Sequence, residues 1–349
     1  MIRVSLISFW TLMFFYVIWR FFVLFGNDSK LIPIIIATIL AALVIWTFMY
    51  SWNSKILDII WTISSWIFVL WFLLMILLLI ENIIHIWYKI NPGFIVWVII
   101  LILWFWIYFA LHTKIINLNI ETDKIHKDTK ILFVSDIHAE NVTQSLHINQ
   151  ILKTIESEKP DFVIIAGDLM NKPNKTYVDY FSAFKSVNTP IFAVVGNHDI
   201  MWNGTIVNDI PKNSGIVFLN NSVTKNDLLN IQVAGIIDKS ARQEKSLNEI
   251  MNQIEFYNDK DWFTILVTHQ PIALEKLNDY PIDLEVAWHT HRGQFFWMRK
   301  VVEWMNDYAY WEYKLWDKTA FISQWIWTWG LPFRLWTQSE MVIINLIKK

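Results

Sequence analysis

The sequence predicts an all-α region of four transmembrane helices followed by an α/β domain. The first 111 of the 349 residues hold only five Lys or Arg and three Asp or Glu, so charge is nearly absent there. From Lys130 on, short runs of β-branched and aromatic residues alternate with amphipathic stretches, as strands alternate with helices in α/β domains. We therefore expect a membrane region at 1–111, a linker at 112–129 and an α/β domain at 130–349.

Four apolar runs carry the membrane prediction. Each reaches the roughly 18 to 20 residues that an α-helix needs to cross the hydrocarbon core of a bilayer. Short polar segments separate them. The runs are residues 4–25, 31–50, 56–80 and 94–111. A secretory signal peptide would show one shorter run and a cleavage site of small residues, which this pattern does not resemble. A buried all-α core is the alternative interpretation.

The four runs also predict a topology. An even number of spans places the N-terminus and the α/β domain on the same side of the membrane. Lys and Arg are more frequent in the segments on that side, so the positive-inside rule favours the cytoplasmic face of a bacterial plasma membrane. Arg20 and His85 could mark a polar site within the membrane, or lie at helix ends with their polar groups in the headgroup layer.

Charge and cysteine content exclude several kinds of site. The part of the chain after residue 111 has 24 basic and 28 acidic residues, so it offers no clustered positive charge for a nucleic-acid backbone. There are no cysteines, which excludes disulfides and zinc-thiolate sites. A nucleic-acid partner is therefore not expected.

Five predicted strands each end in a polar cluster. The strands are residues 131–134, 162–165, 191–195, 263–267 and 284–287. The clusters are Asp136-Ile137-His138, Gly167-Asp168, Gly196-Asn197-His198-Asp199, Thr268-His269 and Trp288-His289-Thr290-His291. Ligands of open α/β sheets bind beyond the carboxyl ends of the strands, so the clusters are expected to converge on one site. Carboxylate, amide oxygen and imidazole groups suit divalent cations.

This ordered set of motifs resembles the calcineurin-like metallophosphoesterase superfamily over residues 130–349, and together with the N-terminal spans it resembles the membrane-anchored subgroup of that superfamily. The resemblance implies a β-sandwich flanked by helices and a centre of two divalent ions (Mn, Fe, Zn or Mg) that holds a hydroxide for phosphoester hydrolysis. One ion would be held by Asp136, His138 and His291, the other by Asn197, His269 and His289, with Asp168 bridging both. By the same resemblance, His198 would be the general acid, and Asp199 would orient His198 or a ligand.

The resemblance implies hydrolysis of a phosphodiester or pyrophosphate without fixing the substrate. The predicted anchor, and a basic apolar stretch at 295–305, favour a membrane-associated lipid substrate. The same stretch is equally well explained as an edge helix packed on the domain core. Two alternatives stay open: a tethered phosphodiesterase for a soluble substrate such as a cyclic nucleotide, and a non-catalytic metal-binding membrane scaffold.

Tryptophan and glycine depart from ordinary usage. The chain has 22 Trp and 9 Gly, 31 residues together, whereas glycine alone usually contributes about 7% of a protein. Members of the resembled superfamily have Gly at the positions of Trp288, Trp325 and Trp327, and often near Trp311 and Trp316. Some bacterial genetic codes translate UGA as glycine and others as tryptophan. Our hypothesis is that many of these tryptophans are glycines in the natural protein; enrichment of Trp at a membrane interface is the alternative.

Overall fold

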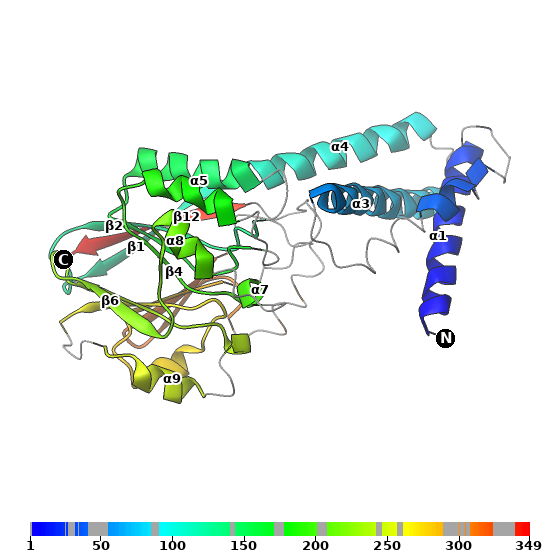
Figure 1. Ribbon diagram of the computed structural model, residues 1–349. Coiled ribbons are helices and arrows are strands. Elements are labelled where there is room, and N and C mark those ends of the chain that lie inside the picture. Colours follow the sequence, from blue (N-terminus) through cyan, green and yellow to red (C-terminus); the bar gives the residue numbers. More distant parts are fainter. Residues whose placement is uncertain are drawn as a thin grey trace. The chain divides into compact units, whose positions relative to one another are not determined.

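The computed structural model describes residues 2–24, 26, 32–33, 35–40, 55–84, 91–139, 144–170, 178–200, 208–241, 246–256, 261–288, 300, 304, 308–323 and 339–349. This part of the chain divides into two compact units, one that ends at Tyr108 and one that begins at Phe109. Figure 1 shows the helices and strands of both units.

The first unit is helical. It contains α1 (Ile2–Leu24), α3 (Lys55–Ile84) and most of α4 (Pro92–Leu111). Residues 32–33 and 35–40 are also helical, and the rest of the predicted span 31–50 lies outside the described residues. The start of α4 follows from its sequence: Asn91 caps it by accepting a hydrogen bond from the Gly93 N–H (2.8 Å), and Pro92 occupies the first turn, where its missing N–H costs nothing.

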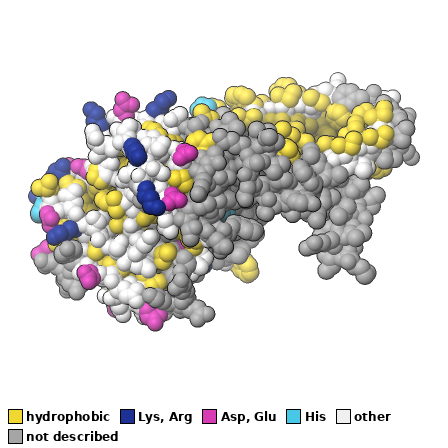
Figure 2. All heavy atoms as spheres, viewed as in Figure 1, with side chains coloured by type: hydrophobic (Ala, Val, Ile, Leu, Met, Phe, Trp, Pro, Cys, Tyr) yellow, Lys and Arg dark blue, Asp and Glu magenta, His cyan; other side chains and the backbone are white. Residues whose placement is uncertain are grey.

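By length and composition alone, one described helix could cross a bilayer. Pro92–Phe109 is long and apolar enough to cross a bilayer, with a mean hydropathy of 2.3, whereas Met13–Leu24 and Leu70–Ile84 are shorter apolar stretches. Figure 2 shows hydrophobic side chains along α4, and Trp97 and Ile100 on it are 56% and 59% exposed. The predicted region of four transmembrane helices is not supported beyond this helix.

Arg20 forms a polar cluster between α1 and α3. Its guanidinium donates to Glu81 Oε2 (3.1 Å) and to Asn82 Oδ1 (3.0 Å). Asn82 in turn donates to the Tyr16 hydroxyl (2.7 Å), and Glu81 is 1% exposed. Of the two interpretations of Arg20, the structure favours the internal polar site over a charge turned toward headgroups.

The second unit contains two mixed β-sheets of six described strands each. The first has the order β1 (Lys114–Thr122), β12 (Glu340–Lys348), β2 (Thr129–Val134), β3 (Phe162–Ile165), β4 (Ile191–Ala193) and β5 (Val217–Phe218). The second has the order β10 (Trp311–Leu315), β11 (Lys318–Ile322), β9 (Leu284–Ala287), β8 (Phe263–Val267), β7 (Ile231–Gly235) and β6 (Ser222–Asn226). The five predicted strands correspond to β2, β3, β4, β8 and β9.

Alternation along the strands divides the core into layers. In β2, Ile131 and Phe133 join a cluster that both sheets share, while Leu132 and Val134 pack with helical residues on the opposite face. A third cluster covers the outer face of the second sheet. Besides the end of α4, the described helices of the second unit are α5 (Gln144–Glu158), η1 (Asp179–Ser186), α7 (Asn197–Ile200), α8 (Ile210–Ser214), η3 (Lys239–Ala241), α9 (Leu247–Gln253) and η4 (Leu274–Leu277). The mixed α/β class is thus confirmed.

The stretch expected to be a linker, 112–129, largely forms a strand instead. Residues 114–122 make β1, which pairs in parallel with β12 along its whole length, Lys114 opposite Glu340 and Thr122 opposite Lys348. Asn117, Asn119 and Glu121 are exposed on one face of β1, whereas Ile116, Leu118 and Ile120 are half-buried or buried on the other. The sequence therefore carries the alternation of a half-buried strand in the stretch that was expected to be a linker. Only His112 and Thr113 separate α4 from β1.

Two tryptophans have backbone angles that favour glycine. Trp311 has a φ of 82° and Trp316 a φ of 56°, a region in which a bulky side chain is strained. Trp316 is the first residue of the two-residue loop between β10 and β11, since Leu315 pairs with Lys318. Glycine is typical at this position of a hairpin when its φ is positive. Both values support the hypothesis that glycine is the natural residue here.

We expect Trp316→Gly to raise the free energy of unfolding by about 0.5 to 1 kcal/mol, because relief of left-handed strain outweighs the added freedom of the unfolded chain. Trp316 is 64% exposed, so little packing is lost. Urea unfolding of the purified chain measures the change. Trp262→Gly is the control: Trp262 has no positive φ and lies 5.8 Å from the Lys225 ammonium, so its removal should not stabilise.

The hypothesis also has a direct test in the source organism. Peptide mass spectrometry of the native protein should show glycine at positions 311 and 316. Tryptophan at both positions, encoded by UGG, would contradict it.

Candidate metal centre

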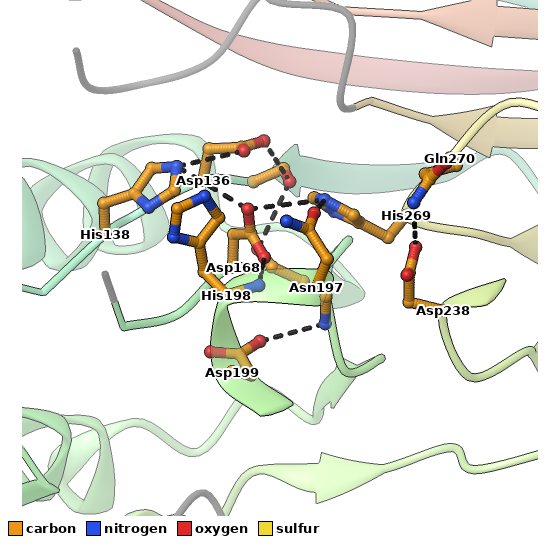
Figure 3. Close-up of polar contacts among 12 residues, drawn as sticks. Asp136, His138, Asp168, Asn197, His198, Asp199, Asp238, His269 and Gln270 are labelled. Carbon is orange, nitrogen blue, oxygen red and sulfur yellow. Dashed lines mark hydrogen bonds and ion pairs between the residues drawn. The ribbon is translucent and has the colours of Figure 1, made fainter. Parts of the chain in front are cut away.

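Most of the predicted site residues lie together at the carboxyl ends of neighbouring strands. Asp136 and His138 follow β2, Asp168 follows β3, and His269 follows β8; all four are at most 1% exposed. Asn197, His198 and Asp199 form the start of α7. Figure 3 shows these side chains gathered in one group. His289 and His291, the other two predicted ligands, lie outside the described residues.

Backbone hydrogen bonds join the loops after β2 and β3. The Asp136 N–H donates to Gly167 O (3.1 Å), and the His138 N–H donates to Asp168 O (2.9 Å). Asp136, His138 and Asp168 all have positive φ, between 44° and 51°. Such angles are unfavourable for residues with a side chain and persist where surrounding contacts impose them, often at functional sites.

Two glycines allow the loops to approach so closely. Gly167 has a φ of 91°, and a Cβ on it would lie 2.8 Å from Gly196 Cα. A Cβ on Gly196 would collide with the Asp168 backbone and carboxylate. Any side chain at Gly196 would therefore displace Asp168.

Asp168 is at the centre of the group. Its Oδ1 accepts a hydrogen bond from the His198 N–H (2.9 Å). Its Oδ2 lies 3.4 Å from His269 Nε2 and 3.7 Å from His138 Nε2. Two sets of potential ligands, with ligand atoms within 4.8 Å of one another, both include this carboxylate: Asp136, Asp168 and His269; and His138, Asp168 and His198. Asp136 Oδ1 also lies 3.3 Å from His138 Nε2, and the resemblance assigns these two residues to one ion.

The donor atoms fit divalent cations. Asp136 Oδ1 and Asp168 Oδ2 are buried and face imidazole nitrogens, His138 Nε2 at 3.3 Å and His269 Nε2 at 3.4 Å, and buried carboxylate oxygens are costly unless a cation meets them. His269 Nδ1 lies 2.8 Å from Ala166 O, a contact that requires a proton on Nδ1 and directs Nε2 into the group. There Nε2 lies 2.9 Å from Asn197 Oδ1. Oxygen and nitrogen atoms thus converge without thiolates, a set that suits Mn, Fe, Zn or Mg.

The carboxylates make the group strongly attractive to positive charge. Burial opposes protonation of His269, yet the nearby Asp168 raises the pKa of this imidazole to about 10. Burial likewise works against the ionised form of Asp168, but His269 and the other histidines hold its pKa below the ordinary value. The same negative charge would attract divalent cations.

Asp199 lies in a different environment from the other carboxylates. Its Oδ1 accepts from the Met170 N–H and its Oδ2 from the Gly196 N–H, both at 3.0 Å. Burial and the charge of Asp168 raise its pKa to about 7. These contacts fix the turn that carries Asn197 and His198, so the structure supports an orienting role. His198 is half-buried, and its ring meets that of His138 edge to face at 4.9 Å.

Two residues beside this group, Ser135 and Gln270, have no role expected from the sequence pattern. Ser135 Oγ donates to Asp136 Oδ2 (2.8 Å), and Gln270 Nε2 donates to Asp238 Oδ2 (2.8 Å). Both Ser135 and Gln270 adjoin a proposed ligand in sequence, and Asp238 follows the end of β7, so position relative to a strand end was the available signal.

Trp288, a position where the resembled superfamily has Gly, packs into the hydrophobic core. The indole is fully buried in the cluster between the sheets, where it meets Phe133 edge to face at 5.9 Å. Its Nε1–H has no hydrogen-bond partner among the described residues, at a cost of about 1 to 3 kcal/mol. A glycine would remove this cost but leave a large volume to fill.

We expect Gly196→Ala to lower Mn²⁺ affinity at least about tenfold, because the added methyl displaces the carboxylate on which both sets depend. Isothermal titration calorimetry measures the affinity. Gly215→Ala is the control: Gly215 also has a positive φ (75°), but an added Cβ would meet nothing within 4 Å. Equal affinity of the two variants would contradict the central position of Asp168.

Comparisons with known proteins agree with this geometry. A family model described as calcineurin-like phosphoesterase matches residues 129–309. A metallophosphoesterase of Helicobacter pylori is 26% identical over 240 residues, 68% of this chain and 64% of that protein. One of Campylobacter jejuni is 28% identical over 236 residues, 66% and 62% of the two chains. The phosphodiesterase YaeI of Escherichia coli is 31% identical over 182 residues, 47% and 61%.

The chain thus spans less than two thirds of the length of each of these relatives. The segment that the family model matches contains every Asp, Asn and His of the group in Figure 3. Since this segment is more than half of the chain, the protein belongs to the calcineurin-like phosphoesterase family, a family of phosphoester hydrolases.

Proposed function

We propose that this protein is a metal-dependent phosphoesterase that hydrolyses a phosphodiester or pyrophosphate at a dinuclear centre built on Asp168. One observation carries the proposal: a buried carboxylate oxygen of Asp168, without a hydrogen-bond partner among the described residues, lies between His138 and His269. A carboxylate that faces two sets of ligands is the arrangement expected of a group that bridges two cations.

The other ligands follow from position. Asp136 and His138 would complete the set on the β2 side, and Asn197 and His269 the set on the β8 side. His289 and His291 are proposed as the remaining ligands because they follow β9, the neighbour of β8. Two bound divalent cations would polarise the phosphoryl group and lower the pKa of water.

His198 is proposed as the group that protonates the leaving oxygen. Its backbone N–H is bound to Asp168 and its ring packs against His138, so the imidazole is held beside the ligands. Unlike the proposed ligands after β2 and β8, His198 is half-buried, which leaves it accessible to a substrate. A histidine so placed can donate a proton at neutral pH.

We further propose that the protein is attached to a membrane and that its substrate is a lipid. The apolar, exposed surface of α4 supports an anchor, and the lack of clustered positive charge in the sequence argues against nucleic acid. A multi-pass arrangement with the domain on the cytoplasmic face stays a prediction from the sequence. The alternatives are a soluble substrate and a scaffold without activity.

We expect the full chain to hydrolyse a nitrophenyl phosphodiester with Mn²⁺, and Asp168→Asn to lose at least about 100-fold in kcat/KM because the bridge is weakened. Initial rates with and without a chelator measure this. Bound Mn²⁺ without hydrolysis of any phosphoester would contradict the enzyme and favour the scaffold. Faster hydrolysis of vesicle phospholipid than of cyclic nucleotide would support the lipid substrate, and the reverse order would favour a soluble one.

The role of His198 predicts a dependence on the leaving group. His198→Asn should lose about 10² to 10⁴-fold in kcat on an alkyl phosphodiester, whose leaving oxygen needs a proton. The loss should be much smaller on the nitrophenyl ester, because nitrophenolate leaves without one. Equal losses on both substrates would show that His198 is not the acid.

A further inference from the structure

Glu285 is a buried ionisable residue that the proposed reaction does not use. It lies in the middle of β9, with 0% exposure, opposite Leu266 of β8 and Ala320 of β11. A charged carboxylate between two central strands is costly unless it is paired. Burial raises the pKa of this carboxyl to about 8.

One oxygen of Glu285 binds both ends of the loop that carries His269. Oε1 accepts from the Thr268 hydroxyl (2.9 Å) and from the Ile272 N–H (2.8 Å). Thr268 immediately precedes His269, and Ile272 follows it by three residues. The Glu285 side chain therefore connects the two ends of the segment 268–272 to strand β9.

Two backbone bonds complete this connection. The Thr268 N–H donates to Val286 O (3.1 Å), and the Trp288 N–H donates to His269 O (3.0 Å). Four hydrogen bonds thus attach the loop that holds His269 to β9 and to Trp288, the residue after it. The Glu285 side chain accepts two of them. At its inner end, His269 Nδ1 is held by Ala166 O.

The second oxygen of Glu285 supports a neutral side chain. Oε2 is buried and has no hydrogen-bond partner among the described residues. A carboxylic acid suits this arrangement better than a carboxylate, because its carbonyl oxygen can take both donors and its hydroxyl carries no charge. Glutamine has the same shape and the same acceptor.

We propose that Glu285 is a positioning residue for His269: by bracketing the loop 268–272 from β9, it sets where the imidazole meets the metal centre. The inference rests on the proposed function, because it assumes that His269 binds a metal. Groups behind a ligand of this kind alter metal affinity by about 10 to 100-fold when removed. A merely structural residue would alter stability alone.

The test compares Glu285→Leu with Glu285→Gln in the full chain, by calorimetric titration with Mn²⁺ and by thermal unfolding. Glu285→Leu removes the acceptor and should lower Mn²⁺ affinity about 10 to 100-fold, whereas Glu285→Gln keeps the acceptor and should stay within about threefold of the unchanged protein. Thr268→Val, which removes one of the two donors, is a milder variant that serves if the leucine variant does not fold.

Gln232→Leu is the matched control. Gln232 on β7 and Thr264 on β8 form another fully buried side-chain hydrogen bond in the same sheet (2.8 Å), away from the loop of His269. This control should lower the melting temperature without changing Mn²⁺ affinity. Glu285→Leu with the same affinity as Gln232→Leu would overturn the inference while leaving the enzyme in place. No Mn²⁺ binding by the unchanged protein would overturn both.

The neutral state of Glu285 has its own readout. Between pH 4.5 and about pH 8, the unfolded chain releases the proton that the folded chain keeps, so the unchanged protein loses stability as pH rises. Glu285→Gln lacks this loss, and its advantage in melting temperature should grow up to about pH 8 and then level off. Tyr308 and Glu275, which lie near this carboxyl, are present in both proteins, and the influence of Glu285 on the pKa of Tyr308 requires an ionised carboxylate, so it falls above about pH 8. An advantage independent of pH would overturn the neutral assignment.

Discussion

The contacts to the Asp168 carboxylate hold together the loops that form the candidate metal centre. The loops after β2 and β3 are joined backbone to backbone around it, the start of α7 donates to it, and His269 faces it from the second sheet. Four segments far apart in sequence thus converge on one buried anion. Close approach is possible because Gly167 and Gly196 present no side chains. The parallel order of β2, β3 and β4, and of β7, β8 and β9, places all these segments at corresponding strand ends.

This convergence also explains what the site requires from the rest of the fold. Unpartnered carboxylate oxygens in a dry interior are unfavourable, so the packed sheets must supply stability that the site does not. The cluster between the sheets does so with fully buried side chains such as Phe133, Ile164 and Val267. Asp199 contributes locally, because its two backbone contacts hold the α7 turn against the loop after Asp168.

Much of this arrangement could be predicted from the sequence because strand ends are easy to recognise. An apolar run followed by Asp, Asn or His predicts both a strand and the edge at which its polar residues lie, and β2, β3, β4, β8 and β9 follow that rule. Contacts across elements could not be predicted in the same way. The bond from Asp199 to the Met170 N–H and that from Glu285 to the Ile272 N–H depend on three-dimensional proximity. Strand β1 was missed although Ile116, Leu118 and Ile120 alternate with polar residues as in a half-buried strand.

The tryptophans mark where local preference and fold disagree. The other non-glycine residues with positive φ in the described part of the chain are Asp, Asn, His or Lys, and most of these types tolerate the left-handed region. Trp311 and Trp316 do not fit that set. At these two residues the backbone has the positive φ typical of glycine although the side chain is an indole. The pairing of β10 with β11 on both sides of the turn imposes this conformation.

The junction between α4 and β1 limits how far the second unit could reach. A flexible linker of 18 residues would let a tethered domain explore distances of about 23 Å. Two residues span at most about 7 Å. If α4 lies in a bilayer, this short connection gives the α/β domain little length with which to search the solution. Its effective concentration toward membrane-bound molecules would then be set by the folded domain rather than by a tether. For a substrate in the same membrane, encounter would then depend on diffusion of that substrate within the membrane plane.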